Sequence, residues 1–244
     1  FSPDYSRSLA FRRGGLAVFK RVVIIGVGLI GGSMALALKN RGLGIQIVGV
    51  GRDETIHKAL DLGVIDQGCS YDQIDQALVG SDLVFLCTPI GRIIDQLKEI
   101  APLVDTGTLV TDVGSTKRKI VECAATFFRP GTYFIGGHPM AGSERSGVTA
   151  ADPFLFQNAI YILAPDSVVP SYLYSNFVEL IRSTGARVLE LPPDAHDEAV
   201  AAISHLPQLM ATKLVEMVGE LNEKFDHYLP LAAGGFRDMT RIAS

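Results

Sequence analysis

The chain has 244 residues, of which 48% are hydrophobic and 20% charged, a composition typical of a globular protein and not of a disordered one. Its formal net charge of −4 excludes a general electrostatic attraction to nucleic acid or to an anionic membrane. No uninterrupted apolar run reaches the roughly 18 residues that a membrane-spanning helix needs. We therefore expect neither a nucleic-acid nor a membrane partner.

The first residues and the cysteines indicate the compartment. Residues 1–19 carry arginines among Ser, Gly and Phe but lack the apolar segment of a secretory signal, so we interpret them as a flexible extension. Cys69, Cys87 and Cys123 are odd in number and widely spaced, which favours reduced thiols over disulfides. Together these features predict a cytoplasmic protein.

The next part of the chain alternates between strand and helix patterns. Residues 21–25 form a β-branched apolar run that is typical of a buried parallel strand. Helix formers over residues 33–40 and a second strand over residues 45–50 complete a unit of the length expected for strand–helix–strand. Further elements follow in the same order: strands over 82–86, 108–111 and 133–135, and helices over 92–100 and 117–128. This alternation predicts an α/β fold with a doubly wound, mainly parallel sheet of the Rossmann type.

The alternation weakens toward the end of this region. Residues 159–163 and 187–191 resemble strands, with a helix over residues 172–183 between them. The strand pattern stops before the Pro-Pro pair at 192–193. We therefore assign residues 20–192 to a dinucleotide-binding domain.

Residues 193–244 predict helices only. Residues 198–223 predict one long helix that Pro207 should kink, and residues 229–244 predict another helix. About 50 residues are too few to bury a helical core alone. We therefore expect a smaller all-helical domain that packs on a second subunit in a homodimer, or a natural chain that continues past Ser244.

A glycine motif stands between the first predicted strand and its helix. Gly26, Gly28 and Gly31 form the pattern G-x-G-x-x-G in this position. The first glycine permits a tight turn, the second lets the backbone approach a pyrophosphate, and the third allows the helix to pack closely on the strand. The helix N-terminus also offers N–H groups to phosphates. The motif predicts that these glycines, with Leu29 and Ile30, bind NADP or NAD; a purely structural turn is the alternative.

Two further segments bear on the cofactor. Gly51, Arg52 and Asp53 end the second predicted strand, where NAD enzymes place a carboxylate for the ribose. A small residue followed by arginine suits a 2′-phosphate and favours NADP, although Asp53 keeps NAD open. Thr88 and Pro89 follow the next strand at the ligand-binding edge of such sheets, so we expect them to line the nicotinamide ribose.

Two loops at the same edge carry candidate catalytic residues. Residues 111–117 include Ser115, and residues 136–144 include His138 beside a pair of glycines. We expect His138 on a loop, where the glycines leave room for a ligand. Histidine exchanges protons near neutral pH, which suits it to acid–base chemistry. Ser115 has an alternative role as the cap of the helix that follows.

Five motifs together resemble a known family. The glycine motif is followed by Asp-Val-Gly-Ser-Thr-Lys, Gly-Gly-His-Pro-Met-Ala-Gly-Ser-Glu, Ser-His-Leu-Pro and Gly-Phe-Arg-Asp-Met-Thr-Arg-Ile-Ala. In this order they resemble the prephenate/arogenate dehydrogenases of tyrosine biosynthesis. The resemblance implies oxidative decarboxylation of prephenate or L-arogenate to 4-hydroxyphenylpyruvate or L-tyrosine, with hydride transfer to NAD(P).

The resemblance also implies roles for three residues. His138 corresponds to the histidine that accepts a hydrogen bond or proton from the ring hydroxyl. Ser115 corresponds to the residue that helps to fix this histidine and the hydroxyl. Arg241 corresponds to the arginine that binds a substrate carboxylate, for which a guanidinium fork is well shaped.

Other positions are expected to contact or shape the substrate pocket. Ser143 and Glu144 shape and gate it in this interpretation, and Glu144 is placed to pair with Arg241. His205 and Gln208 belong to the segment that faces the substrate's side chain, although His205 also fits a packing role inside a helix. Many relatives have histidine where this chain has Gln208, so the choice between prephenate and arogenate stays open.

Two other kinds of protein remain possible from the sequence. A β-hydroxyacid dehydrogenase or pyrroline carboxylate reductase shares the Rossmann start and a helical partner domain. The hydroxyacid enzymes use a lysine base, but Lys213, in the long predicted helix, lacks glycine-rich surroundings. A non-catalytic dinucleotide-sensing module would keep its function after His138→Asn. No His/Cys pair has the spacing of metal ligands, so we expect no metal.

Overall fold

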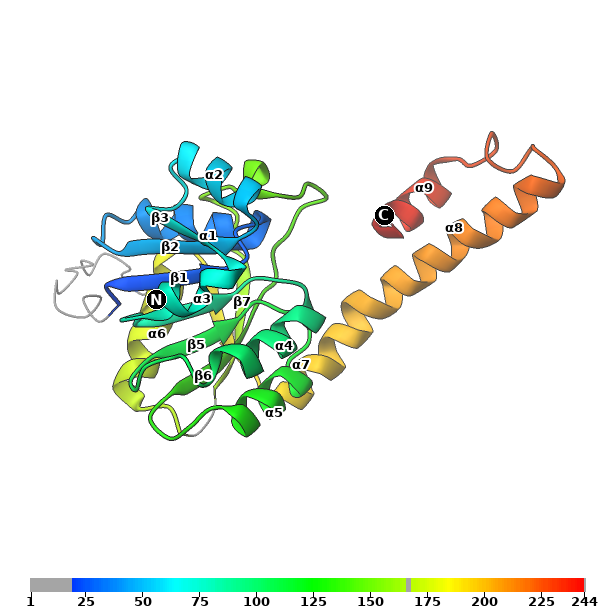
Figure 1. Ribbon diagram of the computed structural model, residues 1–244. Coiled ribbons are helices and arrows are strands. Elements are labelled where there is room, and N and C mark those ends of the chain that lie inside the picture. Colours follow the sequence, from blue (N-terminus) through cyan, green and yellow to red (C-terminus); the bar gives the residue numbers. More distant parts are fainter. Residues whose placement is uncertain (1–18, 166–167, 244) are drawn as a thin grey trace, which may run out of the picture.

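The computed structural model describes residues 19–165 and 168–243. Within these residues, eight strands form one sheet in the order β3-β2-β1-β4-β5-β6-β7-β8 (Figure 1). Only the β6–β7 pair of these described strands is antiparallel. The predicted Rossmann-type, mainly parallel sheet is therefore confirmed. The strands are β1 (Arg21–Ile25), β2 (Gln46–Gly51), β3 (Gln67–Ser70), β4 (Leu83–Leu86), β5 (Leu109–Asp112), β6 (Tyr133–Pro139), β7 (Ile160–Pro165) and β8 (Arg187–Glu190).

Helices cover both faces of the sheet. Successive side chains of β1 point to opposite faces, so Val22 and Ile24 join one apolar cluster, and Val23 and Ile25 join the other. The first cluster includes residues of α1 (Leu29–Lys39), α2 (Asp53–Asp61) and α6 (Ser171–Ser183). The second includes residues of α3 (Ile74–Leu78), α4 (Ile90–Ile100) and α5 (Arg118–Phe127). Burial on both faces explains the continuous apolar run of β1.

The start of the described chain belongs to the core. Residues 1–18 of the predicted flexible extension lie outside the described residues. Phe19, which was assigned to that extension, is buried and packs edge-on against Phe177 with ring centroids 6.5 Å apart. Phe19 therefore belongs to the folded core.

β6 extends further than its sequence pattern predicts. The predicted strand stops at residue 135, but β6 continues to Pro139 because β7 pairs with it antiparallel, with His138 opposite Ile162. The prediction that His138 lies on a loop is therefore wrong. The histidine is held in the backbone ladder of two strands.

The last helices form an arm. α7 (Pro193–Val200) packs against α5, and the π-helical turn η3 (Ala201–His205) leads into α8 (Leu206–Lys224), which runs away from the sheet (Figure 1). The short helix α9 (Gly234–Thr240) and the 3₁₀ turn η4 (Arg241–Ala243) return along α8.

Two helix predictions for this arm need correction. The long helix predicted over residues 198–223, with a kink at Pro207, is helical throughout but is not one α-helix. The π-helical turn η3 interrupts it just before Pro207, whose ring and missing N–H do not fit a continuous helix interior. Of the helix predicted over residues 229–244, the described part reaches residue 243, and within it only residues 234–243 are helical. Short 3₁₀ turns at η1 (Tyr71–Gln73) and η2 (Val148–Ala150) complete the described helical elements. Among the described residues, no helix is both long and apolar enough to cross a membrane.

Candidate active site

A buried ion pair lies beneath the carboxyl edge of the sheet. Asp112, at the end of β5, and Lys117, just before α5, are paired, and both side chains are 0% exposed. Asp112 also accepts backbone N–H bonds from Gly114 at 2.8 Å and from Gly137 at 3.0 Å. Burial raises the pKa of Asp112 and lowers the pKa of Lys117, while their attraction opposes both shifts. One carboxylate thus ties together the segments that carry Ser115 and His138.

The glycine pair before His138 has a packing reason. A Cβ on Gly137 would overlap the backbone carbonyl oxygen of Asp112, and a Cβ on Gly136 would lie 3.1 Å from Cδ of Lys117. Only glycine therefore lets β6 approach β5 and α5 this closely. The sequence motif owes its glycines to this contact with the buried ion pair.

His138 is almost completely buried beside the cofactor-facing edge. Its Nδ1 lies 2.8 Å from Nε2 of His196, so its own Nε2 is the ring nitrogen left for a ligand. Burial, with smaller contributions from the nearby His196, Lys117 and His205, lowers the pKa of His138 to about 3, and Asp197 opposes the shift. A histidine with this pKa is neutral at physiological pH and can accept a proton.

His196 and Asp197 come from α7, and neither was assigned to the site from the sequence. His196 is fully buried, and its Nδ1 lies 2.7 Å from Oδ1 of Asp197. Asp197 also accepts the backbone N–H bonds of Lys117 at 2.6 Å and Arg118 at 3.0 Å. Partial burial raises the pKa of Asp197, but these hydrogen bonds outweigh burial and hold its pKa below the usual value. Asp197 therefore remains a carboxylate that joins α7 to α5.

A cavity of about 490 Å³ lies in front of His138. It joins the α1 N-terminus to the ends of β4, β5 and β6, and its lining includes Leu29, Ile30, Thr88, Pro89, Ser115 and His138. Gly26 has a φ of +98°, and a Cβ there would meet the carbonyl of Cys87, whereas a Cβ on Gly28 would point into open space. These features leave room for a pyrophosphate at the helix N-terminus. The residues present therefore fit a dinucleotide.

The remaining predicted cofactor residues lie around this cavity or beyond it. Gly31 lies inside α1, where a Cβ would overlap the carbonyl oxygen of Gly26. Gly51 is buried at the end of β2, and Arg52 and Asp53 are exposed at the start of α2, outside the cavity lining. The hydroxyl of Thr88 donates to Oε1 of the buried Gln96 at 2.6 Å, a contact that no sequence signal indicated.

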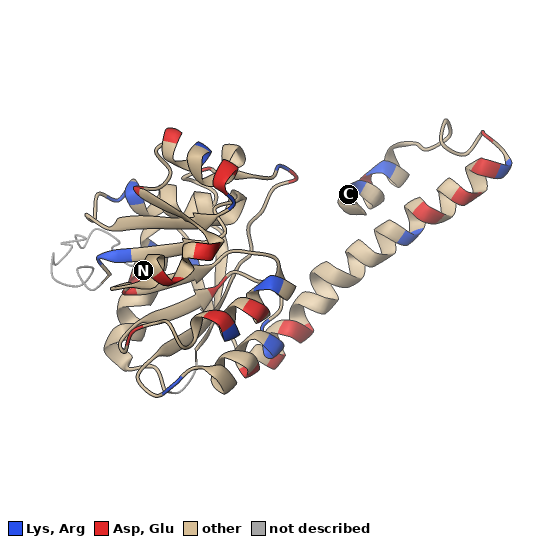
Figure 2. Ribbon diagram, viewed as in Figure 1, with Lys and Arg blue, Asp and Glu red and all other residues tan. Residues whose placement is uncertain are grey.

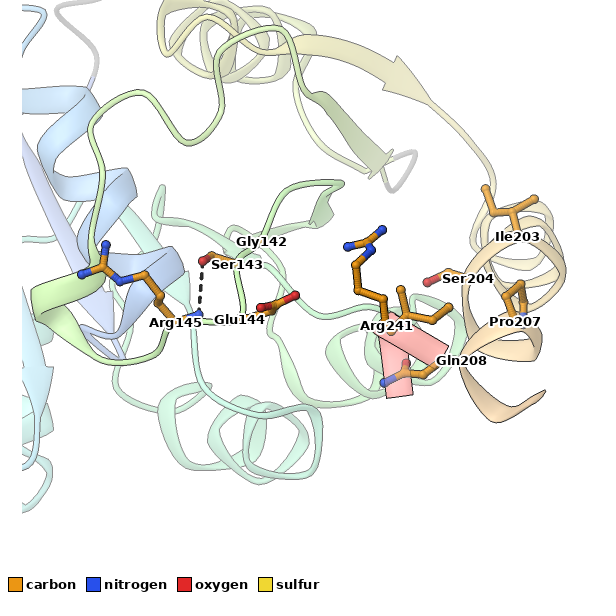
Figure 3. A pocket seen from close by; sticks show the side chains of 10 residues that line it. Gly142, Ser143, Glu144, Arg145, Ile203, Ser204, Pro207, Gln208 and Arg241 are labelled. Atoms are coloured by element: carbon orange, nitrogen blue, oxygen red, sulfur yellow. Dashed lines mark hydrogen bonds between the residues drawn. The ribbon is translucent and has the colours of Figure 1, made fainter. Parts of the chain in front are cut away.

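A second cavity, of about 950 Å³, opens beside the first. Figure 3 shows Ser143 and Glu144 on one side, Ser204, Pro207 and Gln208 on the other, and the Arg241 side chain between them. Arg145 lines both cavities, and its backbone N–H donates to Oγ of Ser143 at 3.2 Å. Ser143, Glu144, Gln208 and Arg241 are therefore brought together next to Ser115 and His138.

Two expectations for the second cavity differ from what the structure shows. His205 is not part of its lining, although it lies near enough to His138 to affect that residue's pKa. Glu144 and Arg241, both within the described part of the chain, form no ion pair there. The two arginines of the lining, Arg145 and Arg241, outnumber its one carboxylate, which suits an anionic ligand. No His/Cys/Asp/Glu group among the described residues is arranged to hold a metal ion.

Comparison with known proteins gives family matches over most of the chain. The family described as "Prephenate dehydrogenase, nucleotide-binding domain" matches residues 34–190, and "Prephenate dehydrogenase, dimerization domain" matches residues 192–244. Prephenate dehydrogenase of Bacillus subtilis is 40% identical over 228 residues, covering 91% of this chain and 60% of that protein. Cyclohexadienyl dehydrogenase of Zymomonas mobilis is 31% identical, covering 94% of this chain and 78% of that protein. The chain thus spans about three-fifths of the length of the Bacillus relative.

Solved structures give the same picture. The Aquifex aeolicus prephenate dehydrogenase, in complex with hydroxyphenyl propionate and NAD+, superposes with a TM-score of 0.84 at 32% identity, over 92% of this chain and 78% of that one. Synechocystis arogenate dehydrogenase gives a TM-score of 0.77 at 32% identity, over 92% of this chain and 79% of that one. A pyrroline-5-carboxylate reductase from Coxiella burnetii, at a TM-score of 0.57 and 16% identity over 83% of this chain and 72% of that one, shares the fold alone.

Proposed function

The chain belongs to the prephenate dehydrogenase family, and from this premise we propose that it catalyses the oxidative decarboxylation of prephenate to 4-hydroxyphenylpyruvate in tyrosine biosynthesis. L-Arogenate, which would yield L-tyrosine, is the second candidate substrate. The observation that carries the proposal is that His138 and Ser115 line the cavity at the α1 N-terminus, which shares Arg145 with the cavity that holds Arg241. In this arrangement His138, the proposed proton acceptor, would lie near both a bound nicotinamide and a substrate anion bound by Arg241.

In the proposed mechanism, His138 acts first. Its neutral Nε2 accepts the proton of the ring hydroxyl, and Ser115 orients that hydroxyl from the loop after β5. The bound nicotinamide ring supplies the acceptor for the hydride that leaves the carbinol carbon. The bond between the ring carbon and the carboxylate then breaks, and CO₂ departs. The electron pair of the broken bond stays in the ring and makes it aromatic, while His138 returns the proton to the oxygen of the former ring hydroxyl. No proton is gained or lost overall.

The second cavity holds the substrate in this proposal. The Arg241 guanidinium binds a substrate carboxylate through paired N–H bonds, and Arg145 adds positive charge at the junction of the two cavities. Ser143 and Glu144 shape the side opposite Gln208. Gln208 offers a neutral amide to the substrate's side chain. A neutral amide does not distinguish the keto side chain of prephenate from the amino side chain of L-arogenate by charge. We place prephenate first because the chain is 40% identical to prephenate dehydrogenases.

For the cofactor, we propose NADP ahead of NAD. Arg52 follows Gly51, which has no side chain to oppose a 2′-phosphate. Arg52 and Arg92 both lie close enough to Tyr71 to lower its pKa, although burial has the larger effect and raises it overall. Two arginine side chains therefore lie near the end of β2. Asp53 is exposed at the next position, so Arg52→Ala should reduce affinity for NADP much more than for NAD if the proposal is right.

We further propose that residues 193–244 form a substrate-binding and dimerisation domain in a cytoplasmic homodimer. The described part of α8 exposes large apolar side chains, among them Leu209, Met210 and Met217. Its half nearer the body carries no charge before Lys213 (Figure 2). Such a surface is typical of an obligate interface. Free thiols at all three cysteines fit a reducing compartment.

One assay tests the activity. The purified chain is incubated with prephenate or L-arogenate and with NAD or NADP, and formation of reduced nicotinamide is followed by its absorbance. We expect turnover with prephenate and its loss in the His138→Asn variant. Absence of turnover in all four combinations would refute the proposed function, and full activity of His138→Asn would refute the role of His138.

A further inference from the structure

A line of three side chains runs from the cofactor-facing cavity into α7. Nδ1 of His138 lies 2.8 Å from Nε2 of His196, and Nδ1 of His196 lies 2.7 Å from Oδ1 of Asp197. The two imidazole rings meet edge-on, with an interplanar angle of 70°, which suits an N–H···N bond. His138 and His196 are buried, so this contact is shielded from water.

The hydrogen-bond donors in this line follow from the last residue. Asp197 is a carboxylate, so it only accepts, and Nδ1 of His196 must carry a proton. A neutral His196 then presents an unprotonated Nε2, which can only accept. His138 must therefore donate from Nδ1, and its Nε2 is left with the free electron pair. That is the nitrogen on which the proposed chemistry depends.

The carboxylate at the far end is itself held in place. Asp197 Oδ1 and Oδ2 accept the backbone N–H groups of Lys117 and Arg118 at the start of α5. The Lys117 ammonium does not compete for Asp197, because Asp112 binds it. With both of its oxygens engaged, the carboxylate has a fixed orientation toward His196. The hydrogen-bonding direction of the whole line is thereby set.

We propose that His196, oriented by Asp197, is a positioning residue that keeps His138 in the Nδ1–H tautomer and shares its proton during turnover. When Nε2 of His138 takes the hydroxyl proton, the Nδ1–H bond of His138 breaks as an Nε2–H bond forms on His196. The positive charge then lies beside Asp197, and the same shift runs backwards when the proton returns. The turnover part of this inference rests on the proposed function; the tautomer part does not.

The test uses the full chain labelled with ¹⁵N at histidine. Long-range ¹⁵N–¹H correlation spectra report which ring nitrogen of His138 carries the proton, with no substrate present. We expect Nδ1–H in the wild-type chain. An Nε2–H form of His138 in the wild type overturns the proposal whether or not the enzyme turns over.

Two substitutions at one position separate positioning from packing. In His196→Gln, the amide oxygen can still accept from Nδ1 of His138, whereas His196→Leu fills the space without an acceptor. We expect the leucine variant to lose the Nδ1–H preference and to lower kcat on the order of 100-fold, within the range of general acid–base contributions. The glutamine variant should keep the tautomer and recover roughly tenfold of that loss, with KM little changed in both because neither side chain touches substrate.

A matched control uses another histidine whose ring lies next to an adjacent aspartate. His227 lies beside Asp226 at the exposed end of the arm, so His227→Gln should leave kcat and the His138 spectrum unchanged. Equal kcat in wild type and His196→Leu overturns the positioning role. If the leucine variant does not fold, the wild-type spectrum and the His196→Gln variant still test whether His138 carries its proton on Nδ1. Lack of turnover by the wild type, with Nδ1–H intact, refutes the proposed function alone.

Discussion

Replacing Lys117 with methionine should destabilise the protein strongly. The substitution keeps most of the side-chain volume but leaves the Asp112 carboxylate without its cation, and both side chains are 0% exposed. Removing one partner of a buried ion pair costs about 3–5 kcal/mol, because the other charge stays buried. Domain stabilities are about 5–15 kcal/mol, so the variant should lose a large share of its free energy of unfolding.

The remaining contacts of Asp112 give this prediction an internal check. Gly114 and Gly137 still donate their N–H groups to the carboxylate, so it keeps partial compensation. In the double variant Asp112→Asn with Lys117→Met, no charge is buried, but one backbone N–H loses its acceptor. The loss of unfolding free energy in the double variant should therefore be smaller than the losses of Asp112→Asn and Lys117→Met added together, by about 0.5–3 kcal/mol.

The stability of the Lys117→Met variant should fall as the pH rises. Without Lys117, the pKa of the buried Asp112 rises further above its unfolded value, so the folded variant holds a proton that the unfolded chain releases. Its stability then falls as the pH rises. The difference in unfolding free energy between wild type and Lys117→Met should shrink when the pH is lowered from about 7.5 to about 5.

The assay is urea denaturation followed by far-UV circular dichroism, at one protein concentration because an oligomer's stability depends on it. Lys213→Met removes an exposed ion pair with Glu216 and serves as the control, with no expected shift in the denaturation midpoint. A Lys117→Met variant whose midpoint matches the control would show that the buried pair does not stabilise the fold.

Three other outcomes follow from the site. Because burial lowers the pKa of His138 to about 3, and the neutral form is needed, the acid-side half-point of kcat/KM should lie well below 6.5; a half-point near 6.5 or above contradicts this. Gly137→Ala should cost about 1–3 kcal/mol in urea denaturation, since its Cβ would overlap the Asp112 carbonyl; an unchanged midpoint would count against that contact. Arg241→Lys should raise KM for prephenate roughly tenfold and change kcat less, because a paired N–H contact is lost; an unaltered KM would remove Arg241 from substrate binding.

The central part of the fold was predictable because its strands are apolar on both faces. Runs such as residues 21–25 and 82–86 mark buried parallel strands, and the glycine motif places the first helix. β3 was missed since Gln67–Ser70 contains no large apolar side chain and is a strand only through its pairing with β2. The end of β6 was also missed, because its glycine-rich segment has no strand pattern of its own and is a strand only through its antiparallel pairing with β7.

The candidate site was predictable where a motif carries it, and not where contacts are distant. Ser115 and His138 stand out beside glycines at strand ends. His196 is 58 residues away from His138 in the chain, and its neighbours Asp194 and Asp197 made it resemble a residue at the start of a surface helix. Asp112 and Lys117 carried a usable signal, since an acid that ends an apolar strand is buried and needs a partner nearby.

The π-helical turn η3 separates two groups of residues that have different jobs. The side chains proposed to handle the proton all precede it and are fixed to the sheet or to α5: His138, His196 and Asp197. Gln208 and Arg241 follow it, in α8 and η4. A rotation at η3 would therefore change the distance between Arg241 and His138 without disturbing the contact of His138 with His196. Substitutions in the arm could therefore change which anion is bound while the residues of the proposed proton transfer keep their geometry.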